Sequence, residues 1–145
     1  MNIRVREAKS GDESAIVALI HELGEDSGYP SPLAEDYVRI YLATPGCQVL
    51  LAEERDRVVG LLSYSVGPDL FHAAGSALIE ELVVHGMDRG RGVGSALLSE
   101  LLRRAAALGC VEVSVTTMPD NEAGQRLYRK HGLVDEAVFL EKHLP

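Results

Sequence analysis

The sequence lacks the features that would place a chain of 145 residues in a specialised class. It has no tryptophan, and its two cysteines, Cys47 and Cys110, form no CxxC pair, which argues against a disulfide framework or a cysteine-rich metal site. The longest apolar run, residues 15–20, is far shorter than the about 20 residues that span a membrane. The N-terminus carries no apolar signal-peptide core. We therefore expect a cytoplasmic protein with two free thiols and no bound metal.

Positive charge is scarce as well. The chain has 14 Lys and Arg against 22 Asp and Glu, a formal net charge of −8, so neither a nucleic acid nor an anionic membrane is expected as a partner. Hydrophobic residues make up 46% and charged residues 25%, which is typical of globular domains. No linker, repeat or low-complexity tract interrupts the chain, so we expect residues 1–145 to form a single domain.

Hydrophobic periodicity predicts an α/β fold with the element order β-α-α-β-β-β-α-β-α-β. The first helix is expected to begin at Ser10 and to end at Gly24, and the second to begin at Ser31. The strand–helix–strand unit over residues 76–115 predicts one parallel pair in a mixed sheet with helices on both faces. The expected strands cover residues 2–8, 47–54, 58–66, 76–84, 111–115 and 133–143, and the later helices cover residues 92–108 and 121–131.

A glycine-rich turn stands between an expected strand and the long helix. Residues 82–95 read Leu-Val-Val-His-Gly-Met-Asp-Arg-Gly-Arg-Gly-Val-Gly-Ser. Glycines let a ligand approach the backbone closely, and the first N–H groups of a helix have no acceptor within it. Arg89 and Arg91 add positive charge. The pattern predicts a phosphate site, while a turn that serves only tight packing is the alternative.

Two common phosphate-binding motifs do not fit this turn. The chain contains no Gly-Lys pair, which a Walker-type loop requires. A dinucleotide fingerprint would need a third glycine where Leu97 stands, and it would follow the first strand rather than the fourth. A nicotinamide-dependent oxidoreductase is therefore the least favoured function.

The pattern Arg89-x-x-Gly92-x-Gly94 resembles the pyrophosphate loop of the GNAT superfamily, the coenzyme A-dependent N-acetyltransferases. A second GNAT-like pattern, N-x-x-x-x-x-L-Y-x-x-x-G-[FL], fits residues 121–133. With both patterns in the family's order, the resemblance covers nearly the whole chain. The departures from the family's usual residues are Gly124 for alanine, Leu133 for phenylalanine and His85-Gly86 for Asp-Pro.

The resemblance implies a sheet whose fourth and fifth strands splay apart beyond a bulge in the fourth. The pantetheine arm of acetyl-CoA would pair with the fourth strand in that gap, and the pyrophosphate would rest on backbone N–H groups of the glycine-rich turn. The implied coenzyme-binding residues are Leu82, Val83, Val84, Arg89, Gly90, Arg91, Gly92, Val93, Gly94, Ser95 and Asn121.

Acetyl transfer to an amine calls for a base near the amine and an acid near the leaving thiolate. The resemblance implies that Tyr128 is the acid, whereas helical periodicity alone would make it a packing residue. Glu80 and Glu81 are consecutive acids in an otherwise apolar strand, and buried acids are unusual unless they are paired. Glu80 matches a family glutamate near the substrate amine and is expected to act as the base through a water. An ion pair is the alternative for either acid and is favoured for Glu81, and His85 is a weaker base.

An acidic stretch marks the candidate acceptor site. Glu25, Asp26 and Tyr29 fall between the first two expected helices, in a connection that forms one wall of the acceptor site in similar proteins. Together with Glu81 they would suit a cationic amine, and a solvated acidic loop is the equally weighted alternative. Residues 71–72 precede the fourth strand and either line this pocket or lie on the surface.

These expectations describe an acetyl-CoA-dependent N-acetyltransferase that acts on a primary amine of a small molecule or peptide. Direct attack in a ternary complex is expected, because neither cysteine lies at a motif position that would make it a nucleophile. The alternative is a non-catalytic acyl-CoA-binding sensor. A homodimer is implied by the resemblance, since family members often pair near the C-terminus.

Overall fold

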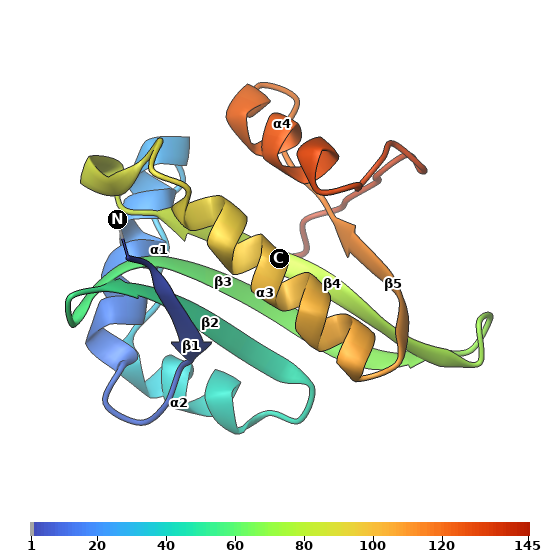
Figure 1. The fold of residues 1–145 in the computed structure, drawn as a ribbon, viewed down its shortest axis with the longest axis horizontal. Coiled ribbons are helices and arrows are strands. Elements are labelled where there is room, and N and C mark those ends of the chain that lie inside the picture. The colour runs from blue at the N-terminus through green and yellow to red at the C-terminus, as the bar shows by residue number, and fades with distance from the viewer. Residues whose placement is uncertain (1) are drawn as a thin grey trace.

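Residues 2–145 are described by a computed structural model built around one five-stranded sheet (Figure 1). The strands lie side by side in chain order, β1-β2-β3-β4-β5. They are β1 (Arg4–Glu7), β2 (Cys47–Glu54), β3 (Arg57–Asp69), β4 (Ala74–Val84) and β5 (Cys110–Val115), and the helices are α1 (Glu13–Ser27), α2 (Glu35–Ala43), α3 (Val93–Ala107) and α4 (Glu122–Lys130), with a short 3-10 turn at Gly86–Asp88.

Helices cover both faces of the sheet, as the sequence predicts, and each face has its own core (Figure 1). The α3-side core combines sheet residues with one helix stripe and one tyrosine of α4; its helical members are Val93, Leu97, Leu98, Leu101 and Tyr128. The α1/α2-side core is smaller and consists of Ile16, Leu19, Val38, Val49, Leu51, Leu61 and Val83. Because residues alternate between the two faces of a strand, β2 and β3 supply apolar side chains to both cores.

Strands β4 and β5 part halfway along β4. The three neighbouring pairs from β1 to β4 are antiparallel, whereas β4 and β5 are parallel. The parallel pairing ends at Ile79 and Val115, while β3 stays paired to β4 as far as Val84. From Glu80 onward, β4 therefore has a strand partner on one side only, which is the expected splay.

A bulge in β4 lies at the point of divergence. Ser63 of β3 pairs with Glu81, and the next residue, Tyr64, pairs with Ile79, so Glu80 is the extra residue. The bulge moves the following side chains to the other face. Ile79 belongs to the α3-side core, whereas Glu81 faces the α1/α2 side.

The expected last strand over residues 133–143 is wrong, because the chain after α4 forms no strand within the described residues. A strand is stabilised by a hydrogen-bonded neighbour and by packing on one face. Here none of the described strands pairs with the segment, and apart from Leu133, which packs on the α3-side core, the large apolar side chains are exposed: Val134, Val138, Phe139 and Leu140. The observed sheet thus has five strands rather than six.

The expected end of the first helix at Gly24 is also wrong, because α1 continues to Ser27 and Gly28 ends it in the left-handed conformation. Gly24 is needed for another reason. A Cβ there would lie 2.7 Å from the carbonyl oxygen of Tyr29, so the glycine lets the chain fold back against the helix. None of the helices between residues 2 and 145 is long and apolar enough to cross a membrane.

Candidate active site

The glycine-rich turn joins the end of β4 to the start of α3. Gly90 and Gly92 have φ values of 76° and 85°, which residues with a Cβ rarely adopt, and an added Cβ at either would meet nothing within 4 Å. Gly92 also stands at the N-cap of α3 without a side chain to occupy the first N–H groups. The helix end therefore faces open space with free donors, as a phosphate site requires.

Gly94 has a different role from the other two glycines. A Cβ on Gly94 would lie 3.0 Å from Cδ2 of Leu127, so the glycine allows α3 to pack closely against α4. The side chain of Val93 is buried in the α3-side core, which leaves only its backbone for a ligand. Ser95 contacts α4 through its hydroxyl, 3.2 Å from Nε2 of His131.

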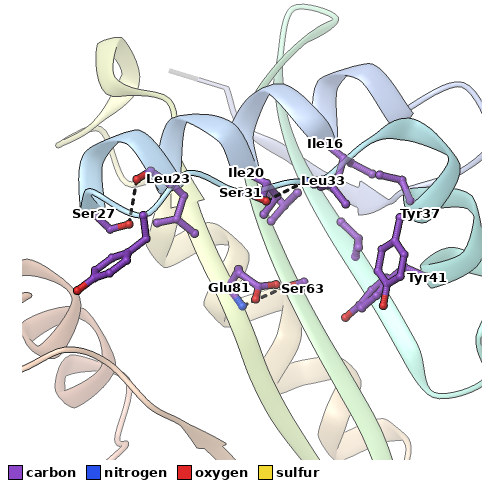
Figure 2. Close-up of a pocket in the computed structure, with 15 residues that line it drawn as sticks. Ile16, Ile20, Leu23, Ser27, Ser31, Leu33, Tyr37, Tyr41, Ser63 and Glu81 are labelled. Atoms are coloured by element: carbon purple, nitrogen blue, oxygen red, sulfur yellow. Dashed lines mark hydrogen bonds between the residues drawn. The ribbon is translucent and has the colours of Figure 1, made fainter. Parts of the chain in front are cut away.

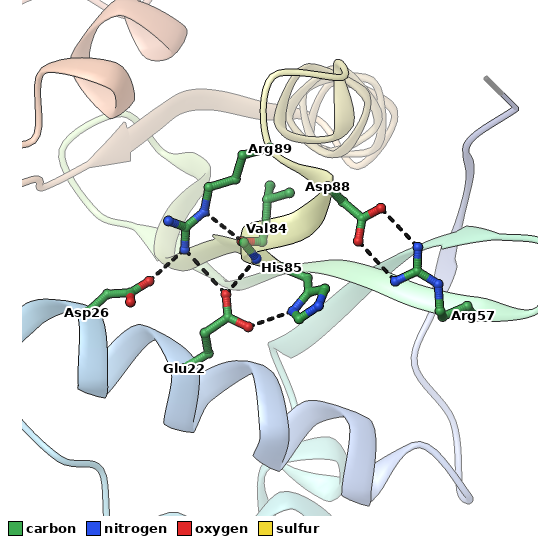
Figure 3. A network of polar contacts seen from close by, with 8 residues as sticks. Glu22, Asp26, Arg57, Val84, His85, Asp88 and Arg89 are labelled. Carbon is green, nitrogen blue, oxygen red and sulfur yellow. Dashed lines mark hydrogen bonds and ion pairs between the residues drawn. The ribbon is translucent and has the colours of Figure 1, made fainter.

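Arg89 is held by acidic residues of α1 (Figure 3). Its Nη2 lies 2.6 Å from Asp26 Oδ2 and 3.3 Å from Glu22 Oε2, and its Nε donates to the carbonyl oxygen of Val84. Glu22 also accepts a hydrogen bond from Gly86 N and lies 2.7 Å from Nδ1 of His85. Asp26 and Glu22 therefore hold the end of α1 against the glycine-rich turn.

Arg91 belongs to a second ion-pair network, on the other side of the turn. Asp88 is only 1% exposed and accepts hydrogen bonds from Arg91 at 2.9 Å and from both Nη atoms of Arg57 (Figure 3). The Arg57 guanidinium holds the pKa of Asp88 below its usual value. Arg91 also pairs with Glu54 at 2.9 Å. These contacts fasten the turn to the β2–β3 hairpin.

Asn121 serves as the N-cap of α4. Its Oδ1 accepts from Gly124 N at 3.1 Å, and its Nδ2 donates to Thr117 Oγ1 at 2.8 Å. A Cβ on Gly124 would lie 2.4 Å from Asn121 Nδ2. The glycine at this position therefore allows the Asn121 side chain to fold back over the first turn of the helix.

Tyr128 lies in the α3-side core and is only 8% exposed. The same core contains Ile79, the last residue of β4 that pairs with β5. Tyr128 and the last paired residue of β4 therefore belong to the same core. Burial raises the pKa of its hydroxyl above the usual value, so the hydroxyl keeps its proton at neutral pH and can donate it.

A pocket of about 420 Å³ lies on the α1/α2 side of the sheet (Figure 2). Its lining comes from α1, α2, the connection between them and strands β2 to β4; the residues are Ile16, Ile20, Leu23, Gly24, Ser27, Tyr29, Ser31, Leu33, Tyr37, Val38, Tyr41, Val49, Leu61, Ser63 and Glu81. Of the predicted acceptor residues, Tyr29 and Glu81 line this pocket. Glu25 and Asp26 do not, although Gly24 and Ser27 of the same helix turn do.

The two consecutive acids of β4 have different surroundings. Glu81 lies in the pocket, where Ser63 Oγ donates to its Oε1 at 2.5 Å and accepts from its backbone N–H at 3.0 Å (Figure 2). Burial raises the pKa of Glu81 above its usual value. Glu80 is exposed, and Ser65 Oγ lies 3.3 Å from its Oε1. The bulge therefore presents Glu81 to the pocket.

Several residues that contact the glycine-rich turn could not be predicted from the spacing of residues in the sequence. Glu22, Glu54 and Arg57 reach the turn from distant elements, and only Asp88, within the turn itself, could have been considered. Residues 71–72 lie at the tip of the β3–β4 hairpin, outside the pocket, and Phe71 is 92% exposed. No group of three or more metal-ligating side chains occurs within residues 2–145.

Comparison with known proteins assigns the family. The model of the acetyltransferase (GNAT) family matches residues 16–133. The chain therefore belongs to the GNAT acetyltransferase family, and its mixed, splayed sheet is the fold of that family.

Three relatives of this chain share between 17% and 31% of their aligned residues with it. The L-2,4-diaminobutyric acid acetyltransferase of Nocardia farcinica is 31% identical over 112 residues, which are 70% of this chain and 56% of the relative. The chain thus spans about half the length of that protein. A transcriptional regulator from Bacillus halodurans is a solved structure with a TM-score of 0.86 and 27% identity, covering 99% of this chain and 100% of the other. An aminoglycoside acetyltransferase from a soil metagenomic sample, solved with sisomicin, has a TM-score of 0.86 at 17% identity over 99% of this chain and 97% of its own.

Proposed function

We propose that the protein is an N-acetyltransferase that transfers the acetyl group of acetyl-CoA to a primary amine by direct attack in a ternary complex. One observation carries the proposal: the same few residues of β4 border both predicted substrate sites. Between Glu80 and Val84 the edge of β4 toward β5 is unpaired, and one face of this segment presents Glu81 to the pocket. A coenzyme along the edge and an amine in the pocket would meet at this strand.

The coenzyme would be held by backbone groups. The pyrophosphate would accept hydrogen bonds from the free N–H groups over residues 90–95. The space where a Cβ of Gly90 or Gly92 would lie is open to such a ligand. The pantetheine arm would pair with the unpaired edge over residues 82–84. The family resemblance implies that Asn121 contacts the coenzyme. In this chain Asn121 is the N-cap of α4, and its hydrogen bond with Gly124 N holds its side chain at the start of that helix.

The chemistry divides between Glu81 and Tyr128. The amine nitrogen attacks the thioester carbonyl carbon, a C–N bond forms, and the C–S bond then breaks. Glu81 accepts the proton that the amine loses, and Tyr128 donates a proton to the thiolate of coenzyme A. We place the base at Glu81, not at Glu80 as the family resemblance suggested, because Glu81 lines the pocket and Glu80 is exposed.

The test is coenzyme A release from acetyl-CoA across a panel of primary amines. Wild type should release coenzyme A with at least one amine class, Tyr128→Phe and Glu81→Gln should lose most of the turnover, and Glu80→Gln should keep it. Equal turnover of Glu81→Gln and wild type, with Glu80→Gln inactive, would move the base to Glu80. Failure of wild type to bind acetyl-CoA in calorimetry would contradict the proposed function itself.

A second function is favoured by one observation. The solved relative from Bacillus halodurans is described as a transcriptional regulator, which fits a non-catalytic acyl-CoA sensor. That function predicts acetyl-CoA binding without turnover for any amine or protein acceptor, and it predicts that Tyr128→Phe leaves function intact. The amine panel therefore separates the two.

We also propose that the protein forms a homodimer in a reducing compartment such as the cytoplasm. The exposed apolar side chains over residues 134–144 support an interface there, and both cysteines are free thiols. Light scattering on wild type and on a chain shortened after Gly132 tests the dimer. A monomeric wild type at micromolar concentration would contradict it.

A further inference from the structure

The pocket on the α1/α2 side has apolar walls and a small polar floor (Figure 2). The walls consist mainly of Ile16, Ile20, Leu23, Leu33 and Val38. Such walls favour an apolar group, since burying methylene groups away from water is favourable. The floor groups are the Glu81 carboxylate, the Ser63 hydroxyl and the Tyr41 hydroxyl.

The Tyr41 hydroxyl is a buried polar atom that lacks a partner. Its oxygen is shielded from solvent and has no hydrogen-bond partner within the part of the chain that the structure describes. Burial raises the pKa of Tyr41, and the charge of nearby Glu81 adds to the effect. A buried oxygen left without a partner is costly. A donor N–H that reached the Tyr41 oxygen would supply the partner it lacks, and Glu81 lines the same pocket.

Beyond this floor, the pocket offers no partner for a second charge. Among its lining residues Glu81 is the sole acid, and none is Lys, Arg or His. Asp26, an acid of the expected wall that does not line the pocket, is bound to Arg89 at 2.6 Å. A charged group buried without a partner is strongly disfavoured. The pocket therefore suits one amine at the floor and an uncharged remainder.

We infer that the acceptor is a primary monoamine carried on an apolar chain or ring, with its amine at Glu81 and Tyr41. This inference rests on the proposed function and names its substrate class. It sets the pocket apart from those of acceptors with a second charge, such as the amino acid and the aminoglycoside named for the relatives. The distal end of the acceptor lies against α1, near Leu23 and Ser27.

The test uses three primary amines with the same number of carbon atoms and different distal ends. These are n-pentylamine with a methyl end, 1,5-diaminopentane with an ammonium end, and 5-aminopentanoate with a carboxylate end. Coenzyme A release should give n-pentylamine a kcat/KM at least tenfold above each of the other two. Equal or higher kcat/KM for either charged amine would overturn the inference.

A pair of variants tests where the distal end lies. Ser27 is exposed at the pocket, so Ser27→Asp adds a second carboxylate beside Leu23 without filling the core. This variant should raise the ratio of kcat/KM for 1,5-diaminopentane over n-pentylamine about tenfold. Ser14→Asp adds the same charge on the same helix outside the pocket and should leave the ratio unchanged. Equal ratios for both variants would overturn the inference.

Failure of the inference and failure of the proposed function give different results. Turnover of a charged amine but not of n-pentylamine would overturn the substrate class and leave the N-acetyltransferase standing. No turnover with any of the three, with acetyl-CoA still bound in calorimetry, would also overturn the substrate class. Absence of acetyl-CoA binding would overturn both.

Discussion

The two sides of β4 differ in their charges and in how those charges are paired. On the turn side, charges are dense, and Arg89 and Arg91 are each held by two carboxylates. On the pocket side, the lining is mostly apolar and contains one acid, Glu81. The comparison teaches that the arginines of the turn are already engaged within the protein, so the free backbone N–H groups at the start of α3 are the available donors for a phosphate.

The largest expected effect lies where the two sides meet. Tyr128→Phe removes the hydroxyl of the proposed acid but keeps the ring in the α3-side core. We expect kcat to fall about 100-fold, which corresponds to about 2.7 kcal/mol, because the leaving thiolate loses its proton donor. Steady-state kinetics measure kcat, and calorimetry should find an unchanged affinity for acetyl-CoA. An unchanged kcat would leave Tyr128 a packing residue.

The next effect concerns the ion pairs of the turn. Asp88→Asn removes a buried charge that holds both Arg57 and Arg91. We expect a loss of about 2 kcal/mol in the free energy of unfolding, below the about 3–5 kcal/mol of fully buried pairs because both arginines are partly exposed. Urea unfolding measures it. Asp56→Asn makes an equal charge change in the exposed β2–β3 turn and should lower the free energy of unfolding far less. A similar loss for both variants would mean that the ion pairs of Asp88 do not stabilise the fold.

A third experiment separates ligand binding from backbone strain. Gly92 and Gly109 have φ values of 85° and 81°, and an added Cβ meets nothing within 4 Å at either. Each change to alanine should cost about 1–2 kcal/mol of stability through the left-handed conformation. Only Gly92→Ala should weaken coenzyme A binding, about tenfold, because its Cβ would occupy the phosphate approach. Equal affinities of the two variants in calorimetry would contradict a phosphate site at the start of α3.

The smallest effect concerns the pocket side and depends on pH. Because burial raises the pKa of Glu81 in the folded chain, the folded state holds that proton more tightly than the unfolded state. Stability is therefore lost as pH rises from the ordinary carboxyl range through the raised pKa. Glu81→Gln removes this loss. The Tm of the variant minus the Tm of wild type should therefore be about 1–3 °C higher at about pH 8 than at about pH 4.

Calorimetric melting curves at both pH values check this prediction. Glu80→Gln is the matched control, because Glu80 is the exposed neighbour on the same strand. A difference between Glu81→Gln and wild type that is the same at both pH values would contradict the burial of Glu81.

Local patterns account for what the sequence predicts well. The glycine-rich turn and the 121–133 pattern are contiguous, so their elements and the family follow from neighbouring residues. Which acid enters the pocket could not be predicted, because the bulge at Glu80 is set by pairing with Ser63 and Tyr64, distant in the chain. The role of Asp26 was missed for the same reason, since its partner Arg89 is 63 residues away.

Other expectations failed because one pattern fits two structures. Gly24 looks like a helix end, yet here it serves close packing against Tyr29. Apolar residues over 133–143 look like a strand, yet a strand forms only where a partner edge and a packing surface are available.

The parting of β4 and β5 has a consequence for how the protein guards itself against aggregation. A sheet edge offers unpaired N–H and C=O groups that can template pairing with any other strand. Here such an edge lies inside the sheet: the Val84 carbonyl points away from β3, and Arg89 donates to it. Because the edge is closed off at one end by β5 and flanked by α3 and α4 (Figure 1), a thin flexible chain bearing amides can reach it more readily than a rigid neighbouring strand. The edge at which we propose that the coenzyme binds is thus shielded from the strands of other proteins.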